Sequence, residues 1–424
     1  MSTSSRRRRR TPRRPVLFLI TDLIVGLTAA PVFAQEEATD GEATAEESPD
    51  EQPAPDPSEA SANNDATVTL APGQGLRIRG ADDAYALQFR GIFQGHYEYE
   101  TTGGQPDHNS FFLRLLRVDA QGHAFTEDLT FRLMPELARQ ASLLDGWVSY
   151  RFTDGFQLRG GQFNIPFNWE RHSPPTRHQF GDRTVANNEF QWPTGRDLGL
   201  MAHGDPADQI RYGVGIFSGQ GINARRSDSE GLMASGRLVY TPVGEYATSE
   251  VPVEAADDFN LSIGAGALYA LRNGARDWAD WDPVGAQQAD VVNTTADVGI
   301  RWSRLSTHLT GFYRHVTPDA PEGADELPAD AQPETLERFD GFGFGANTAV
   351  LIIPERLTGI VRYSEAQPNR ETDLGRQREL LGGVHLFHRG LDSRFQLQAG
   401  VESEYEDDDW RNDFVANLQY QFIF

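Results

Sequence analysis

Apolar and polar residues alternate along most of this chain, and the alternation limits its fold more than any other feature. In YALQFRGIFQGHYEYE, residues 85–100, the odd positions hold only Tyr, Leu, Phe and Gly, while most even positions hold Gln, Arg, His or Glu. The closing stretch NLQYQFIF, residues 417–424, alternates in the same way. Successive side chains of a β-strand point to opposite faces, so these segments predict strands whose faces meet different surroundings.

The same alternation recurs between clusters of turn-forming residues. TDG at 153–155 and GDPADQ at 204–209 are two such clusters, and their composition is typical of turns. No comparable stretch shows a helical period with caps, so the sequence predicts an all-β fold. Alternating segments cover residues 129–136, 156–161, 210–217, 298–302, 305–313, 395–401 and 414–424.

The N-terminal residues have the features of a secretory signal. Residues 6–14 hold seven arginines, an apolar stretch runs from Val16 to Leu27, and small residues precede a cleavage position at Ala34. The apolar stretch is shorter than the roughly 20 residues that a membrane-spanning helix needs. We therefore expect residues 1–34 to be a cleaved signal peptide, with an N-terminal membrane anchor as the alternative.

Residues 35–66 differ sharply from the rest of the chain. They hold 11 acids and four prolines, with no basic and no aromatic residue. Such a segment cannot bury enough apolar area to offset the entropy lost on ordering. We expect a disordered acidic linker at 35–66, followed by one folded unit at 67–424.

The folded unit contains no run of 18 apolar residues, so a membrane-spanning part can only be a β-barrel. Phe, Tyr and Trp are frequent near the ends of its apolar faces, as in interfacial girdles. With spanning strands of about 9–11 residues, its length suits a transmembrane antiparallel β-barrel of about 16 strands. A soluble sandwich or propeller is the alternative.

Charge and composition exclude several classes of function. All 38 basic residues are arginine, and removal of the signal peptide leaves 31 of them (38 minus 7) against 61 acids (62 minus 1). This negative charge disfavours a nucleic-acid partner. The chain has no cysteine, which excludes disulfides, thiolate metal sites and a cysteine nucleophile. Hydrolase, metalloprotease and P-loop motifs are missing, so we expect no enzyme, metal or other cofactor.

Several longer stretches resemble a known family. FFLRLLRVDAQGHAFTEDLTFRLMPEL at 111–137 and LLDGWVSYRFTDGFQLRGGQFNIPFNWE at 143–170 resemble the paired-strand block of the phosphate-selective porin (O/P) family. GRDLGLMAHG, YGVGIFSGQGIN and GRLVYTPVG follow in that family's order. The resemblance implies a sixteen-stranded, trimeric porin in the outer membrane of a Gram-negative bacterium. It also implies passage of small anions, phosphate-like ones in the founding members.

Arginines on the inward face are the candidate pore-lining residues. The alternation along residues 129–136 directs Arg132 towards the lumen, and the same phase directs Arg211 inward. Residues 171–196 are too long for a tight turn and are our candidate constriction loop, in a region where the resemblance also implies the narrowing. Guanidinium groups match oxyanions in geometry and keep their charge. The predicted anion-binding residues are Arg117, Arg132, Arg159, Arg171, Arg177, Arg183, Arg196 and Arg301.

Alternatives to each of these interpretations stay open. Each arginine can instead be a solvated lumen charge paired with an acid, and residues 171–196 can be an ordinary surface loop. The phosphate specialists of the family resemble one another in using lysines at the pore mouth, and this chain has none. We therefore expect chloride and phosphate-like oxyanions to pass with little discrimination. A general or weakly cation-selective porin and a structural barrel that tethers the envelope are the alternatives.

The remaining expectations concern surfaces and partners. The acidic segments 277–283, 318–337 and 402–410 are predicted to be outward loops. Besides small anions, the expected partners are outer-membrane lipid, lipopolysaccharide and two further copies in a homotrimer. The aromatic C-terminal Phe424 resembles the signal that barrel-assembly machinery recognises, so that machinery is the last expected partner.

Overall fold

The computed structural model describes residues 66–80, 83–102, 105–138, 140–224, 231–245, 249–273, 289–318, 338–370, 375–406 and 409–424. The predicted signal peptide and all but the last residue of the predicted linker lie outside these ranges. So do the acidic segment 277–283 and most of 318–337. The predictions made for these segments therefore stay predictions.

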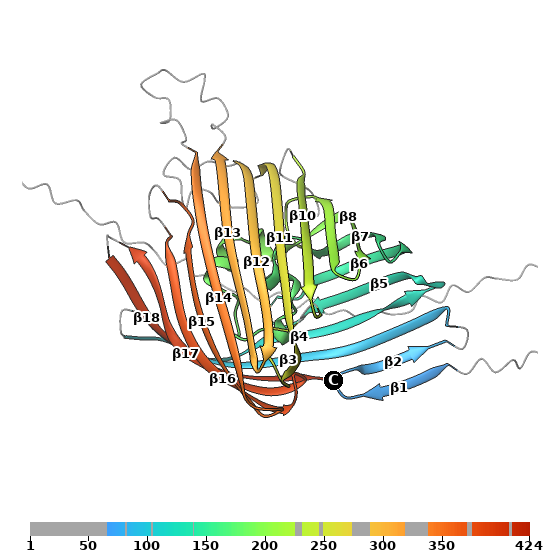
Figure 1. The fold of residues 1–424 in the computed structure, drawn as a ribbon, viewed down its shortest axis with the longest axis horizontal. Coiled ribbons are helices and arrows are strands. Elements are labelled where there is room, and N and C mark those ends of the chain that lie inside the picture. Colours follow the sequence, from blue (N-terminus) through green and yellow to red (C-terminus); the bar gives the residue numbers. More distant parts are fainter. Residues whose placement is uncertain are drawn as a thin grey trace, which may run out of the picture. The chain divides into compact units, whose positions relative to one another are not determined.

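Sixteen antiparallel strands close into a β-barrel, as the alternation predicts (Figure 1). Each strand pairs with the next along the chain, and β18 pairs with β3 to complete the ring. The strands are β3 (Tyr85–Thr102), β4 (Gln105–Ala124), β5 (Thr126–Glu136), β6 (Ser142–Thr153), β7 (Phe156–Asn164), β8 (Arg196–Ala207), β9 (Ile210–Phe217), β10 (Met233–Val243), β11 (Ala256–Asn273), β12 (Ala289–Ser303), β13 (Leu305–Pro318), β14 (Phe339–Ile353), β15 (Leu357–Gln367), β16 (Gln377–Arg389), β17 (Ser393–Glu406) and β18 (Asp409–Ile423).

The ring closes at the end of the chain. Ile423 of β18 lies opposite Ile92 of β3, and the backbone of Phe424 exchanges hydrogen bonds of 2.9 and 3.0 Å with Gly91. A Cβ at Gly91 would overlap the ring of Phe424. Beyond this point β3 pairs with an additional hairpin, β1 (Thr67–Ala71) and β2 (Gly75–Arg79), which the alternation did not predict.

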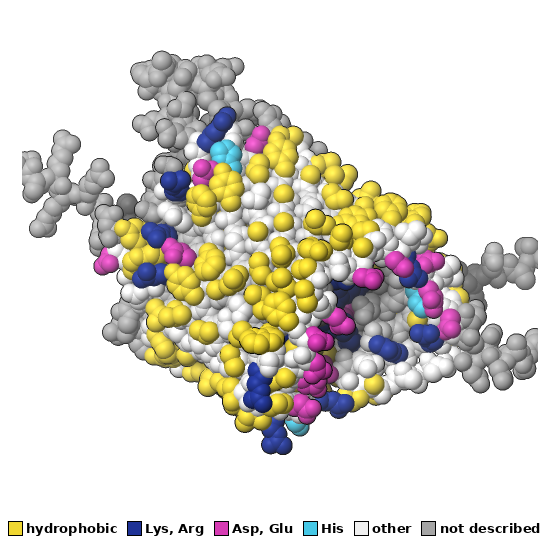
Figure 2. Space-filling model, in the orientation of Figure 1, with side chains coloured by type: hydrophobic (Ala, Val, Ile, Leu, Met, Phe, Trp, Pro, Cys, Tyr) yellow, Lys and Arg dark blue, Asp and Glu magenta, His cyan; other side chains and the backbone are white. Residues whose placement is uncertain are grey.

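The two faces of the barrel wall differ as the sequence predicts. On β18, Leu418 and Phe422 are 43% exposed on the outer face, while Gln419 and Gln421 are almost fully buried on the inner face. Figure 2 shows hydrophobic side chains spread over the outer face of the strands, with charged side chains gathered at its margins. An apolar outer band of this kind suits contact with lipid.

The connection between β7 and β8, residues 165–195, lies inside the barrel and is called the inner loop below. Its Trp169 stacks on His308 of β13 with ring centroids 4.9 Å apart, and its Phe190 stacks on Phe312 at 5.7 Å. The main apolar core therefore lies between the inner loop and the barrel wall. The loop contains α1 (Trp169–His172), η1 (Pro175–Arg177), α2 (Val185–Phe190) and η2 (Pro193–Gly195).

Local hydrogen bonds explain why the inner loop forms helices. The Asn168 side chain accepts from the backbone N–H of Arg171 at 2.9 Å, and the Thr184 hydroxyl accepts from that of Asn187 at 3.0 Å. Such caps satisfy N–H groups that a first helical turn leaves without partners. No helix among the residues described here is long and apolar enough to span a membrane.

One predicted loop is wrong. The segment 402–410 was expected to be an outward excursion, but β17 continues to Glu406 and β18 begins at Asp409. The acids are compatible with a strand because Arg411 pairs with Glu404 at 2.7 Å across the two strands. Because arginine neutralises the acids in this way, a segment in which acids and aromatic residues alternate can form paired β-strands.

Candidate functional site

The inner loop is attached to the barrel wall by hydrogen bonds from its backbone. The N–H of Gly181 donates to Gln398 and that of Val185 to Glu379, each at 2.9 Å. Within the loop, Glu170 accepts from both the N–H and the hydroxyl of Thr184, at 3.0 and 2.8 Å. These contacts hold residues 171–183 in a fixed position across the lumen.

A second segment reaches the inner loop from the connection between β10 and β11. The backbone N–H of Gln179 donates to the Glu250 carboxylate at 2.9 Å, and the N–H of Glu250 donates to the carbonyl of Arg177 at 3.1 Å. Burial raises the pKa of Glu250 to about 7, and the nearby Glu170 adds to the effect. Residues 249–253 thus contact and support the inner loop through the carboxyl group of Glu250, whose pKa lies near neutral pH.

Between the inner loop and the wall lies a cavity of about 570 Å³, called the arginine cavity below. Asp392 is the one carboxylate among the described residues that line it. A confined cavity of low dielectric strengthens the field of fixed charges and weakens screening. Its seven lining arginines are Arg90, Arg117, Arg132, Arg171, Arg177, Arg183 and Arg196.

Acids behind the lining neutralise some of these arginines. Asp145 pairs with Arg196 at 2.8 Å and with Arg132 at 3.3 Å. Glu136 pairs with Arg117 at 2.6 Å. These three arginines therefore have acid partners, which is one part of the alternative interpretation.

Arg171 and Arg183 differ from their neighbours. Within the described part of the chain, neither forms an ion pair with a carboxylate, and Arg183 donates to the backbone carbonyl of Glu170 at 3.0 Å. Burial and the adjacent arginines lower the pKa of Arg183 to about 9 and hold that of Arg171 well below its usual value. Arg183 still carries its charge at neutral pH. The inner loop therefore presents two arginines that, among the described residues, have no carboxylate ion-pair partner.

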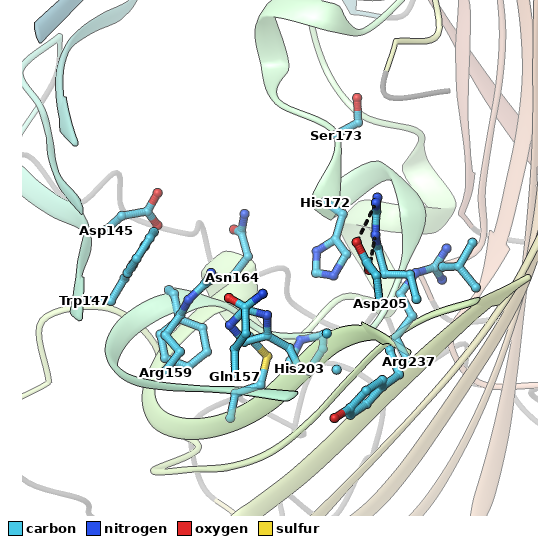
Figure 3. A pocket seen from close by; sticks show the side chains of 18 of the residues that line it. Asp145, Trp147, Gln157, Arg159, Asn164, His172, Ser173, His203, Asp205 and Arg237 are labelled. Carbon is cyan, nitrogen blue, oxygen red and sulfur yellow. Dashed lines mark hydrogen bonds and ion pairs between the residues drawn. The ribbon is translucent and has the colours of Figure 1, made fainter. Parts of the chain in front are cut away.

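A second cavity of about 460 Å³, called the tryptophan cavity below, adjoins the first and shares Arg132, His172 and Arg177 with it. Figure 3 shows Trp147 and Arg159 together on one side of it and Arg237 on the other. The Arg159 guanidinium lies over the Trp147 ring, 4.0 Å from its centroid.

The structure brings most of the predicted arginines together. Arg301 lies elsewhere, beside His308 in a small separate pocket, and its side chain donates to the carbonyl of Glu254. Arg159 lines the tryptophan cavity. The six that line the arginine cavity are Arg117, Arg132, Arg171, Arg177, Arg183 and Arg196.

Three lining arginines were not selected from the sequence. Arg90 occupies an even, inward position of β3, so the alternation alone could have identified it. Arg211 was assigned to the inward face but left out of the site, and it lines the tryptophan cavity with its partner Asp205. Arg237 lines the same cavity and pairs with Asp297 at 2.6 Å. In the ranges that the structure describes, no group of histidines and acids could hold a metal ion.

Comparison with protein families matches residues 85–265 to the family Phosphate-selective porin O and P. A comparison with curated proteins gave no match. Among solved structures, the anion-selective porin from Comamonas acidovorans is similar, with a TM-score of 0.55 and 10% identity, over 80% of this chain and 100% of that one.

Two further solved structures have a similar fold. The outer membrane channel DcaP of Acinetobacter baumannii aligns with a TM-score of 0.52 and 10% identity, over 81% of this chain and 99% of that one. The trimer form of OmpT, an outer membrane protein of Vibrio cholerae, aligns with a TM-score of 0.50 and 11% identity, over 80% of this chain and 100% of that one. At these identities the similarity concerns the fold.

Proposed function

We propose that this chain passes small anions through its arginine cavity. It would do so as an outer-membrane β-barrel of a Gram-negative bacterium. Over residues 85–265 it is similar to the phosphate-selective porin O and P family. Transport is passive diffusion, and chloride and phosphate-like oxyanions are the solutes. The family match and the barrel fold support an outer-membrane porin rather than an enzyme.

One observation supports anions rather than cations as the solutes. Seven arginines and a single carboxylate line the arginine cavity, among the residues described. Arg171 and Arg183 extend from the inner loop without carboxylate partners there, so their charge acts on whatever enters. Guanidinium groups bind oxyanions through paired N–H donors. A ring of fixed positive charge lowers the entry barrier for anions and raises it for cations.

A weakly cation-selective general porin is the second candidate. Glu402 and Asp413 face each other on the inner side of β17 and β18, towards the ends of these strands. Acids at that level attract cations and oppose the arginines. We favour anions because Arg411 pairs with Asp413 at 3.1 Å, whereas Arg171 and Arg183 are not balanced in this way.

Charge reversal tests the proposal. The double variant Arg171→Glu with Arg183→Glu should shift the reversal potential of the purified protein, in a planar bilayer under a KCl gradient, towards cations. Arg301→Glu is the matched control, because Arg301 faces the lumen outside both large cavities. Equal shifts from the control and the double variant would contradict a role for the arginine cavity.

The expected assembly is also part of the proposal. We infer a homotrimer, supported by the trimer form of the similar Vibrio cholerae barrel. Three further expectations from the sequence remain proposals. They are the signal peptide at 1–34, the contact with lipopolysaccharide and the recognition of Phe424 by the assembly machinery.

A further inference from the structure

The tryptophan cavity differs in chemistry from the arginine cavity beside it. Four aromatic residues line it in addition to its arginines, whereas no Phe, Trp or Tyr is among the described residues that line the arginine cavity. Its volume of about 460 Å³ lies in the range typical of small-molecule sites. The aromatic residues are Trp147, Phe163, Trp169 and Tyr212.

Arg159 is placed to receive an anion in this cavity. Its guanidinium lies 4.0 Å from the centroid of Trp147 and 5.7 Å from that of Phe163. Within the described ranges it forms no ion pair with a carboxylate, and its Nε is buried without a hydrogen-bond partner. The aromatic rings hold the guanidinium plane by cation–π contact while its N–H donors stay available.

Apolar surface lies next to this cation. Met201, Val239 and Pro166 line the same cavity, and the cavity has two carboxylates, Asp145 and Asp205. Both acids are already paired, Asp145 with Arg196 at 2.8 Å and Asp205 with Arg211 at 2.9 Å. A chloride or phosphate ion would use the charge of this cavity but not its aromatic and aliphatic surface.

We propose that the tryptophan cavity is a binding site for small organic carboxylates with a planar apolar body. The carboxylate binds the Arg159 guanidinium, and the apolar body packs against Trp147 and the adjacent aliphatic side chains. The inference rests on the proposed anion pathway and adds a class of solute to it. Figure 3 shows Trp147 and Arg159, the two residues that would hold the solute, close together in this cavity.

Block of chloride current tests the site with benzoate and acetate as probes. Both carry one carboxylate, but only benzoate has a planar apolar body. For the wild-type protein in planar bilayers, benzoate should reduce the KCl current at a concentration about three- to tenfold lower than acetate does, because burial of an aromatic ring strengthens binding. Equal potency of the two ions would overturn the proposal, and this comparison needs no variant.

Substitutions then locate the site. Trp147→Ala should bring the potency of benzoate close to that of acetate, and Arg159→Gln should weaken block by both ions. Trp302→Ala is the matched control, since Trp302 is 62% exposed on the outer face of the barrel. Trp147→Phe keeps an aromatic ring and should retain most of the preference. If Trp147→Ala behaves like Trp302→Ala, the cavity is not the site.

Failure of this inference and failure of the anion pathway have different signatures. A wild-type protein that prefers potassium to chloride in a KCl gradient contradicts the pathway. A wild-type protein that prefers chloride but is blocked equally by benzoate and acetate contradicts only the organic carboxylate site.

Discussion

At the scale of single residues, Arg171 and Arg183 are the side chains that most need explanation. Burial of a charge without an ion-pair partner is costly. Burial lowers the pKa of both guanidinium groups, and neighbouring arginines add to the effect, Arg183 on Arg171 and Arg196 on Arg183. A structural role alone gives no reason to place them on a loop that crosses the lumen. An anion drawn from solution would supply the missing charge.

Single neutral substitutions should therefore weaken anion preference in proportion to the charge removed. We expect Arg183→Gln to lower the chloride-to-potassium permeability ratio about two- to fivefold at low salt. The effect should shrink in concentrated KCl, where the Debye length is shorter. Reversal potentials at two salt concentrations measure both. Arg301→Gln is the control, and an effect of Arg183→Gln that does not depend on salt would contradict the electrostatic origin.

Glu250 predicts a pH dependence of the inner loop. Its pKa rises from 4.5 to about 7 in the folded protein, so the docked state holds a proton that the undocked carboxyl releases. Docking of residues 249–253 is therefore favoured at acidic pH and weakens as pH rises through about 7. Glu170 adds repulsion when Glu250 ionises, whereas the hydrogen bond from the Gln179 N–H and the charges of Arg362 and Arg183 reduce the effect.

Hydrogen exchange at a single amide measures how the docking of residues 249–253 on the inner loop weakens with pH. The N–H of Gln179, which donates to Glu250, should lose protection between pH 6 and pH 8 after correction for the intrinsic rate, and Glu250→Gln should remove the change. The N–H of Gly181 is an internal control because it donates to the neutral Gln398. Equal pH dependence at both amides would show that Glu250 does not control docking.

At the scale of elements, the last strand closes the barrel through its terminal residue. Replacement of Phe422 and Phe424 by serine should lower the amount of inserted protein, because β18 loses lipid-facing aromatic area and its expected assembly signal. Outer-membrane fractionation measures the inserted amount. Trp302→Ser, on the outer face of another strand, is the control, and normal insertion of the double serine variant would rule out this role.

Gly91 gives an independent test of the same closure. A Cβ at Gly91 would overlap the Phe424 ring, whereas nothing lies within 4 Å of a Cβ at Gly311. Gly91→Ala should displace the Phe424 ring and lower the thermal stability of the folded barrel slightly, and Gly311→Ala should leave it almost unchanged. Circular dichroism melting in detergent compares the two, and equal melting temperatures would contradict the tight contact.

Many of the barrel strands could be predicted from sequence because they obey a local rule, whereas the β1–β2 hairpin and the ends of β17 and β18 could not. The period-two pattern places Leu418 and Phe422 outside and Gln419 and Gln421 inside, as the structure confirms. The site was only partly predictable, because Arg171 and Arg183 meet Arg117 through contacts between distant segments. Alternation also gives no indication of acid partners across strands, so it did not reveal that Asp145 pairs with both Arg132 and Arg196.

At the scale of the whole molecule, assembly and selectivity are separate questions. Native mass measurement in mild detergent should give three copies of the mature chain. A protein that stays monomeric in every mild detergent, while keeping its strand content by circular dichroism, would contradict the trimer. That result would leave the arginine cavity of each barrel as described, since all seven of its arginines come from one chain.

The sign of the wild-type reversal potential tests the central claim most directly. The chain is strongly acidic overall, with 62 acids against 38 basic residues, so its total charge and its arginine cavity favour opposite ions. In a planar bilayer with a KCl gradient and the purified protein, a reversal potential with the sign of chloride preference is the predicted result. A reversal potential with the sign of potassium preference would contradict the proposal that the arginine cavity controls passage.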